Sequence, residues 1–220
     1  MFVCLDVDYR VRGAVAAAVL FPSWEAPAPC GEQIAIIDEV APYTPGSFFL
    51  RELPCLLAVL GKIPGGLGAL RLVVIDGYVW LNGAGHKGLG AHLFHQLEGC
   101  IPVVGVAKNS FTGAAAFPVL RGASKRPLWV TAAGLSLEDA AAGVMAMHGP
   151  HRIPTMLQRV DQLCRRSLPH PRWLPSAPSC HHVLYGTRFG FSSGATFCLG
   201  ICTMSRENSS LPMSPCTSMY

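Results

Sequence analysis

Short apolar runs rich in β-branched residues alternate with segments of helical periodicity along the first three-quarters of the chain. The apolar runs predict strands over residues 2–9, 11–21, 32–40, 70–76, 102–107 and 127–132. The helical pattern predicts helices over residues 47–60, 88–98, from Ser136 onward and 154–166. Pro54 lies inside the first of these helices, so we expect a break or a late start there.

The order of these elements predicts the fold class. Short connections between the first three strands are typical of an antiparallel meander, and helices then alternate with strands. This is the order of a ribonuclease H-like fold, an α/β arrangement with a mixed central sheet flanked by helices. The 220 residues are half hydrophobic and 14% charged, which suits one domain with a well-buried core.

The composition changes at Ser167. Residues 169–220 hold four charged residues, six prolines and four cysteines, without clear periodicity. We therefore expect a folded domain over residues 1–168 and an irregular or disordered tail over 169–220. A flexible tail, a small extra module and an out-of-frame extension all remain open, and the composition favours the extension.

Cysteine usage and apolar runs bear on the compartment. The first five cysteines are scattered without a CxxC pair, which indicates reduced thiols in a cytoplasmic protein. Cys198 and Cys202 lie near His181 and His182, but their spacing fits no common zinc pattern. No apolar run reaches the roughly 18–20 residues of a membrane span, and no signal peptide is evident. The net charge of +4 gives weak support for an anionic partner.

Three carboxylates indicate a candidate site. Asp76 ends the apolar run of residues 70–76, where a carboxylate is costly to bury unless a cation pairs with it. Asp6 in the opening strand and Glu52 in the helix of residues 47–60 could reach the same place, which suggests a divalent-metal nuclease centre. The alternative is that each acid is separately solvated or salt-bridged. Asp8 shares a strand face with Asp6, so it is either a further carboxylate of the site or solvent-facing.

Motifs in a fixed order resemble those of the endonuclease V family, which nicks nucleic acid near deaminated adenine. The resemblance runs from about Phe2 to Arg166. The motifs are Leu5-Asp6-Val7, Pro42-Tyr43-Thr44-Pro45-Gly46 followed by Arg51-Glu52, Ile75-Asp76-Gly77, Gly105-Val106-Ala107-Lys108, Pro127-Leu128-Trp129-Val130-Thr131 and His151-Arg152-Ile153-Pro154.

The resemblance implies a metal-dependent endonuclease of nucleic-acid repair. Asp6, Glu52 and Asp76 would hold Mg²⁺, or Mn²⁺ in its place, through oxygen ligands. Lys108 would act as a catalytic cation beside the phosphate without being a metal ligand. The implied partner is inosine-containing DNA or RNA, bound by a cytoplasmic monomer without a membrane association.

The same resemblance implies how the altered base is recognised. Tyr43, on a turn between two prolines, would enter the duplex and fill the space that the flipped base leaves. The hypoxanthine pocket would use the backbone around Gly46, Phe48 and Gly77.

The chain also departs from the family pattern, which places it in a divergent branch. Asn82 stands about where the family carries a histidine, with His86 nearby, and Ala133-Gly134-Leu135 replaces a later histidine. These losses keep open a protein that binds inosine-containing nucleic acid with little or no cleavage.

A dinucleotide-binding enzyme is a further alternative, because residues 83–88 fit G-x-G-x-x-G. The match is weak, because its glycines begin seven residues after Asp76 rather than in a tight turn.

Overall fold

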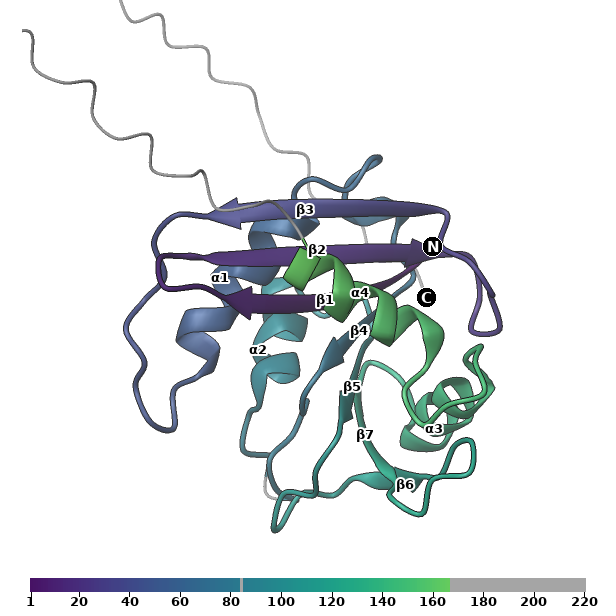
Figure 1. The fold of residues 1–220 in the computed structure, drawn as a ribbon. Coiled ribbons are helices and arrows are strands. Elements are labelled where there is room, and N and C mark those ends of the chain that lie inside the picture. Colours follow the sequence, from purple (N-terminus) through teal and green to yellow (C-terminus); the bar gives the residue numbers. More distant parts are fainter. Residues whose placement is uncertain (84, 167–220) are drawn as a thin grey trace, which may run out of the picture. The chain divides into compact units, whose positions relative to one another are not determined.

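The computed structural model describes residues 1–83 and 85–166 and contains a seven-stranded mixed sheet (Figure 1). The strand order is β3-β2-β1-β4-β5-β7-β6. Strands β1 to β3 pair antiparallel, β4 and β5 run parallel to β1, and β7 runs antiparallel to β5 and β6. The strands are β1 (Phe2–Tyr9), β2 (Ala14–Phe21), β3 (Gly31–Ile37), β4 (Leu72–Asp76), β5 (Val103–Ala107), β6 (Phe117–Val119) and β7 (Leu128–Ala133).

Helices cover both faces of this sheet (Figure 1). Helices α1 and α2 pack on one face, and α3 and α4 pack on the other. None of the helices in the described part combines the length and apolar character that crossing a membrane requires. The helices are α1 (Phe49–Leu60), the 3-10 helix η1 (Leu67–Ala69), α2 (Leu89–Gln96), α3 (Leu137–Ala146) and α4 (Thr155–Arg166). This arrangement confirms the predicted α/β, ribonuclease H-like fold.

The alanine-rich strand β2 lies between two helical layers. All eight of its residues are buried. Ala16 and Ala18 join the core under α1 and α2, whereas Ala17 and Val19 join the core under α3 and α4. Successive side chains of a strand point to opposite faces, so a strand covered on both sides is apolar throughout. Small side chains here let α1 and α4 pack closely on either side of β2.

The structure corrects two details of the prediction. Helix α1 begins at Phe49 and is continuous across Pro54, so the break or late start predicted at that proline is wrong. Pro54 lies on the exposed side, where the missing backbone donor weakens the helix without opening the core. Strand β6 was not predicted, because three residues including Pro118 are too few to show alternation. The predicted tail, residues 169–220, lies outside the described residues.

The strand directions bring the predicted acids to one edge of the sheet, at the carboxyl ends of the central strands β1 and β4. Strands β1 and β4 are parallel with Leu5 opposite Ile75, so Asp6 lies beside Asp76. The same edge receives the end of β5, which is followed by Lys108. A Cβ on Gly105 would lie 2.6 Å from the Gly77 carbonyl oxygen, so glycine lets the segment after Asp76 pack against β5.

A buried arginine organises the segment between α3 and α4. Arg121 is 6% exposed, and burial lowers the pKa of its guanidinium. Its nitrogens donate to backbone carbonyls instead of pairing with a carboxylate. The acceptors are the carbonyl oxygens of Met145, Met147, Gly149 and His151. Four carbonyls held by one rigid fork fix the path of the chain into α4.

Candidate active site

Asp6 stands in β1 on the face that α4 covers. Its Oδ1 accepts a hydrogen bond from the backbone N–H of Val7 at 2.9 Å. Burial, followed by the negative charges of Asp76 and Asp161, raises the pKa of Asp6 to about 6, although the Val7 hydrogen bond lowers it. The side chain therefore lies in a buried environment that also carries negative charge.

Glu52 is the most deeply buried acid of the site. It stands in the first turn of α1 and is 7% exposed. Its Oε2 is buried without a hydrogen-bond partner. Burial first, then the charges of Asp6 and Asp76, raises the pKa of Glu52 to about 8. The neighbouring Arg51 does not neutralise it, because its guanidinium lies over the Tyr9 ring, 4.0 Å from the centroid.

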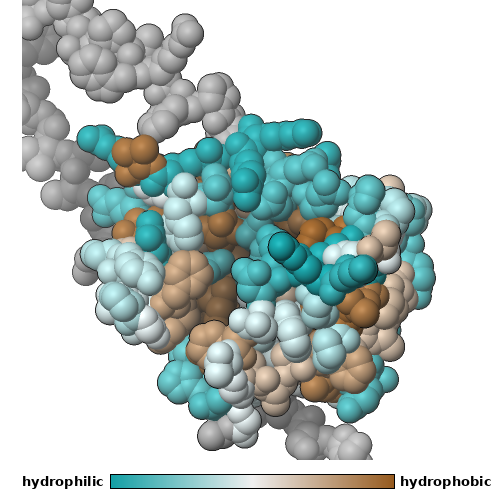
Figure 2. Space-filling model, turned by 60° about the horizontal axis from the view of Figure 1, so that its bottom comes forward, coloured by the Kyte–Doolittle hydropathy of each residue, from teal (hydrophilic) through white to brown (hydrophobic). Residues whose placement is uncertain are grey.

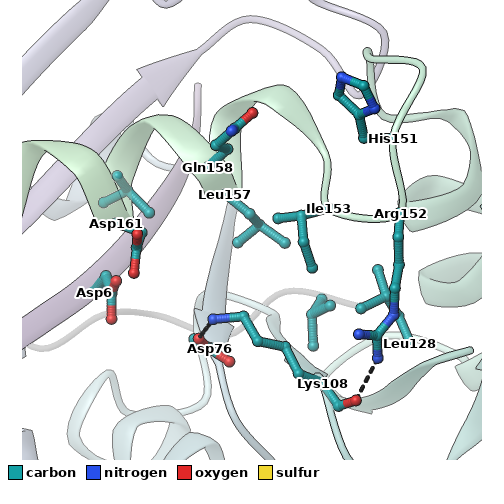
Figure 3. Close-up of a pocket in the computed structure, with 12 residues that line it drawn as sticks. Asp6, Asp76, Lys108, Leu128, His151, Arg152, Ile153, Leu157, Gln158 and Asp161 are labelled. Atoms are coloured by element: carbon teal, nitrogen blue, oxygen red, sulfur yellow. Dashed lines mark hydrogen bonds and ion pairs between the residues drawn. The ribbon is translucent and has the colours of Figure 1, made fainter. Parts of the chain in front are cut away.

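Lys108 supplies a positive charge to this edge. Its Nζ lies 2.5 Å from Oδ2 of Asp76, as the dashed line in Figure 3 shows. Burial lowers the pKa of Lys108, but the hydrogen bond and charge of Asp76 outweigh burial, so the pKa is raised overall. Lys108 is therefore a cation beside the carboxylates.

A fourth carboxylate, Asp161 of α4, was not predicted. It lines the same cavity as Asp6 and Asp76, and its charge raises the pKa of Asp6. The available signal was its position, since it shares a helix face with the buried residues Leu157 and Cys164. Asp161 also pairs with Nη2 of Arg165, one turn further along α4, at 2.9 Å. Asp8 does not take this role, because it does not line that cavity, and its carboxylate pairs with Nε of Arg10 at 2.9 Å.

The donor set fits a hard divalent cation. In the described residues, no group of three or more His, Cys, Asp or Glu side chains converges closely enough to hold a metal ion as it stands. Three of the acids are engaged elsewhere: Asp6 accepts from the Val7 N–H, Asp76 accepts from Lys108, and Asp161 pairs with Arg165. Mutual repulsion also keeps carboxylates apart. The excess negative charge and the unpartnered Oε2 of Glu52 nevertheless match the oxygen ligands that Mg²⁺ takes.

Two cavities meet at Asp76. The larger, of about 360 Å³, lies under α4 and includes Asp6 and Asp161 among its lining residues (Figure 3). The smaller, of about 160 Å³, lies between the start of α1 and the segment after β4, with Glu52 in its wall. Its lining also includes Gly46, Phe48, Gly77, Tyr78 and Lys87.

The smaller cavity thus brings together three of the residues predicted to surround the altered base: Gly46, Phe48 and Gly77. Tyr43 stands outside this lining and is 63% exposed. That exposure is compatible with a side chain that acts on a bound molecule rather than on the core.

The two positions at which the family carries a histidine lie in different parts of this structure. Asn82 accepts a hydrogen bond from the backbone N–H of His86 at 2.8 Å, within a hairpin closed by a bridge between Trp80 and Lys87. Neither Asn82 nor His86 lines the two cavities. Ala133 pairs with Val103 at the start of β5, so the position after β7 lies at the opposite edge from Asp76. That second replacement therefore leaves the carboxylate edge unchanged.

The glycine motif of residues 83–88 belongs to the same hairpin. It lies in a long connection between β4 and α2, not in a tight turn that leads from strand to helix. Gly88 packs closely, because a Cβ there would lie 2.5 Å from the Tyr78 carbonyl oxygen. This geometry explains the glycine without a dinucleotide.

Comparison with known proteins agrees with the site. Residues 1–138 match the Endonuclease V family model. Endonuclease V of Streptomyces avermitilis is 36% identical over 190 residues, which cover 74% of this chain and 79% of that protein. The Streptomyces coelicolor enzyme is 33% identical over 189 residues, covering 74% and 77%.

Solved structures give the same result. The crystal structure of the S. avermitilis endonuclease V has a TM-score of 0.60 at 34% identity and covers 75% of this chain and 79% of that one. Ciona intestinalis endonuclease V shares the fold, with a TM-score of 0.63 at 18% identity and coverage of 74% and 84%. The chain therefore belongs to the endonuclease V family of metal-dependent nucleases, as its motifs predicted.

Proposed function

We propose that this protein cuts DNA or RNA near deaminated adenine, with Mg²⁺ or Mn²⁺ as its cation, and so acts in nucleic-acid repair. The observation that carries the proposal is the carboxylate cluster that shares Asp76 with a small adjoining cavity. The Ciona endonuclease V was solved with DNA that contains an inosine followed by a ribo-adenosine. We bring that substrate class to this chain because its cavity presents the backbone of Gly46 and Gly77.

The catalytic roles follow from the positions of the side chains. Asp6, Glu52, Asp76 and Asp161 would hold the cation through their carboxylate oxygens. When bound, the cation supplies an activated water and neutralises charge on the leaving oxygen. Lys108 donates to Asp76, so a phosphate bound beside Asp76 comes within reach of the same ammonium.

Recognition of the base would rest on backbone groups. Gly46 has φ +78° and Gly77 has φ +140°, and nothing lies within 4 Å of a Cβ built on either. The space beside both glycines is therefore open to a base, while Phe48 offers an apolar wall. The Gly77 N–H is bonded to the Val106 carbonyl oxygen at 3.2 Å, so a hydrogen bond to the base edge would come from the backbone of Gly46. Tyr43 would fill the position in the duplex that the base has left.

Cleavage is favoured over binding alone because the site retains all its acids. Four carboxylates repel a phosphodiester unless a cation offsets them, so a protein that only bound nucleic acid would gain from losing them. We place the activity in residues 1–168, in a cytoplasmic monomer. The free cysteines of the described part support a reducing compartment.

Asp76→Asn should lower Mg²⁺-dependent nicking of an inosine-containing oligonucleotide by at least about a hundredfold. Mutation of residues that only support the metal ligands typically lowers metal affinity or activity by about 10–100-fold, and Asp76 is proposed as a ligand itself. Asp161→Asn should also lower nicking, by about tenfold or more. Glu138→Gln, an exposed acid of α3, is the control and should keep wild-type activity. Undiminished nicking by Asp76→Asn would refute the assignment.

Tyr43→Ala should weaken binding to an inosine-containing duplex by about 1–3 kcal/mol, the scale of a lost base–aromatic contact. Because the side chain is 63% exposed, the melting temperature should stay unchanged. Tyr43→Phe retains the ring and should bind nearly as well as wild type. An equal loss on duplexes with and without inosine would reject a role specific to the altered base.

The metal-free protein should lose stability as the pH rises. Folding raises the pKa of Glu52 from 4.5 to about 8, so the stabilising proton is present at low pH and is lost as the pH rises through about 8. A tenfold difference in proton affinity between the folded and unfolded chain corresponds to about 1.4 kcal/mol, so the loss should reach a few kcal/mol. Glu52→Gln should flatten this dependence and melt higher than wild type at high pH. Parallel melting curves for the two proteins would contradict a buried, unpaired Glu52.

A further inference from the structure

The function proposed so far uses only one end of the larger cavity, where Asp6, Asp76 and Asp161 lie, and leaves the rest without a role. This cavity lies on the other side of Asp76 from the cavity assigned to the altered base. Asp76 is the one lining residue that the two cavities share. A strand whose altered base enters the smaller cavity can therefore reach the larger one past Asp76.

The walls of the larger cavity differ along its length. Asp6, Asp76 and Asp161 lie at one end, and Arg152 and His151 lie at the other (Figure 3). The middle is apolar, with Leu157 and Ile153 between the two ends and Leu128 beside Arg152 in the same view. An apolar middle between two polar ends does not suit a phosphate, but it suits the flat, apolar faces of a base or sugar.

Arg152 gives the far end a positive charge. Its Nη2 donates to the Pro127 carbonyl oxygen at 2.8 Å and to that of Lys108. Within the described residues no carboxylate pairs with Arg152. Its Nε is buried without a hydrogen-bond partner. A guanidinium that is anchored by backbone groups and keeps its charge is suited to a phosphate.

Lys108 and Arg121 hold this cavity in place. Lys108 runs along one edge, since its ammonium reaches Asp76 while its carbonyl oxygen accepts from Arg152 (Figure 3). Arg121 fixes the segment that carries His151 and Arg152 through its bonds to that segment's carbonyls. The cavity is therefore formed before any ligand arrives, and its 360 Å³ falls within the range of small-molecule sites.

We propose that the larger cavity binds the nucleoside on the side of the cut bond away from inosine, with the next phosphate at Arg152. This inference rests on the proposed function. It assigns the enzyme a second subsite, so that the strand is bound on both sides of the bond that is cut. On the face turned forward in Figure 2, the apolar side chains surface as separate patches among polar ones.

The test removes the base from that one nucleotide. An inosine-containing oligonucleotide is compared with a copy that carries an abasic residue immediately beyond the cut bond. For the wild-type protein, loss of the base should lower the nicking rate by about tenfold or more, the scale of a lost base contact. An abasic residue several nucleotides farther away should change the rate less than twofold.

A variant that fills the cavity links the effect to this site. Gln158 is exposed and lines the cavity, so Gln158→Trp adds bulk there without disturbing the core. Its nicking of the intact strand should fall about tenfold, and removal of the base should cost nothing further. Met145→Trp adds the same bulk at an exposed position of α3 outside the cavity and should behave as wild type. Melting temperatures check that both variants fold.

Each outcome decides the proposal. Wild-type nicking that is indifferent to the abasic residue overturns the subsite while the proposed function stands, and so does full activity of a folded Gln158→Trp variant. If wild type does not nick inosine strands at all, the proposed function fails instead. Equilibrium binding of the same two oligonucleotides with Ca²⁺ then decides the subsite: weaker binding of the abasic strand supports it, and equal binding overturns it.

Discussion

The burial of acidic side chains at one edge of the sheet, to which their mutual repulsion adds, is the constraint around which the molecule is arranged. Asp6 and Asp76 reach that edge on adjacent parallel strands, and Glu52 and Asp161 arrive from helices on opposite faces. Burial raises the pKa of Glu52, so the folded chain resists ionising the very group that a cation requires. The apolar layers on both faces of the sheet must supply the free energy that offsets this cost.

The local backbone serves the same edge. Gly105 lets the segment after Asp76 pack against β5, and Thr131 accepts a hydrogen bond from the Val79 N–H at 2.8 Å in that segment. The small residues of β2 let α1 and α4 close on either side. As a result the two cavities lie on either side of Asp76 and do not merge. A nucleic-acid strand that passes Asp76 can therefore contact the protein in both cavities.

Much of this arrangement could be predicted from the sequence, for identifiable reasons. Runs of β-branched residues marked the strands that end at Asp76 and carry Asp6, because a strand buried on both faces is apolar throughout. Glu52 was found by its interval from the tyrosine turn rather than by helix pattern. Asp161 was missed, since one acid in a strongly amphipathic helix resembles an ordinary surface charge.

Other features depend on tertiary structure. The direction of β7 decides that its end lies far from Asp76, and no local pattern separates a parallel from an antiparallel strand there. Asp8 pairs with Arg10 and does not line the cavity, and this pairing likewise depends on the turn between β1 and β2. The continuity of α1 across Pro54 reflects packing of the following turns against the sheet, which overrides the local preference.

Direct binding of Mn²⁺ to the metal-free protein, followed by electron paramagnetic resonance and competed by Mg²⁺, tests the central claim that these carboxylates form one cation site. We predict saturable binding that the double variant Asp6→Asn, Glu52→Gln abolishes. Asp8→Asn, which removes an acid from the same strand face, should leave binding unchanged. Mn²⁺ binding that survives the double variant, or that is absent from the wild-type protein, would contradict the account.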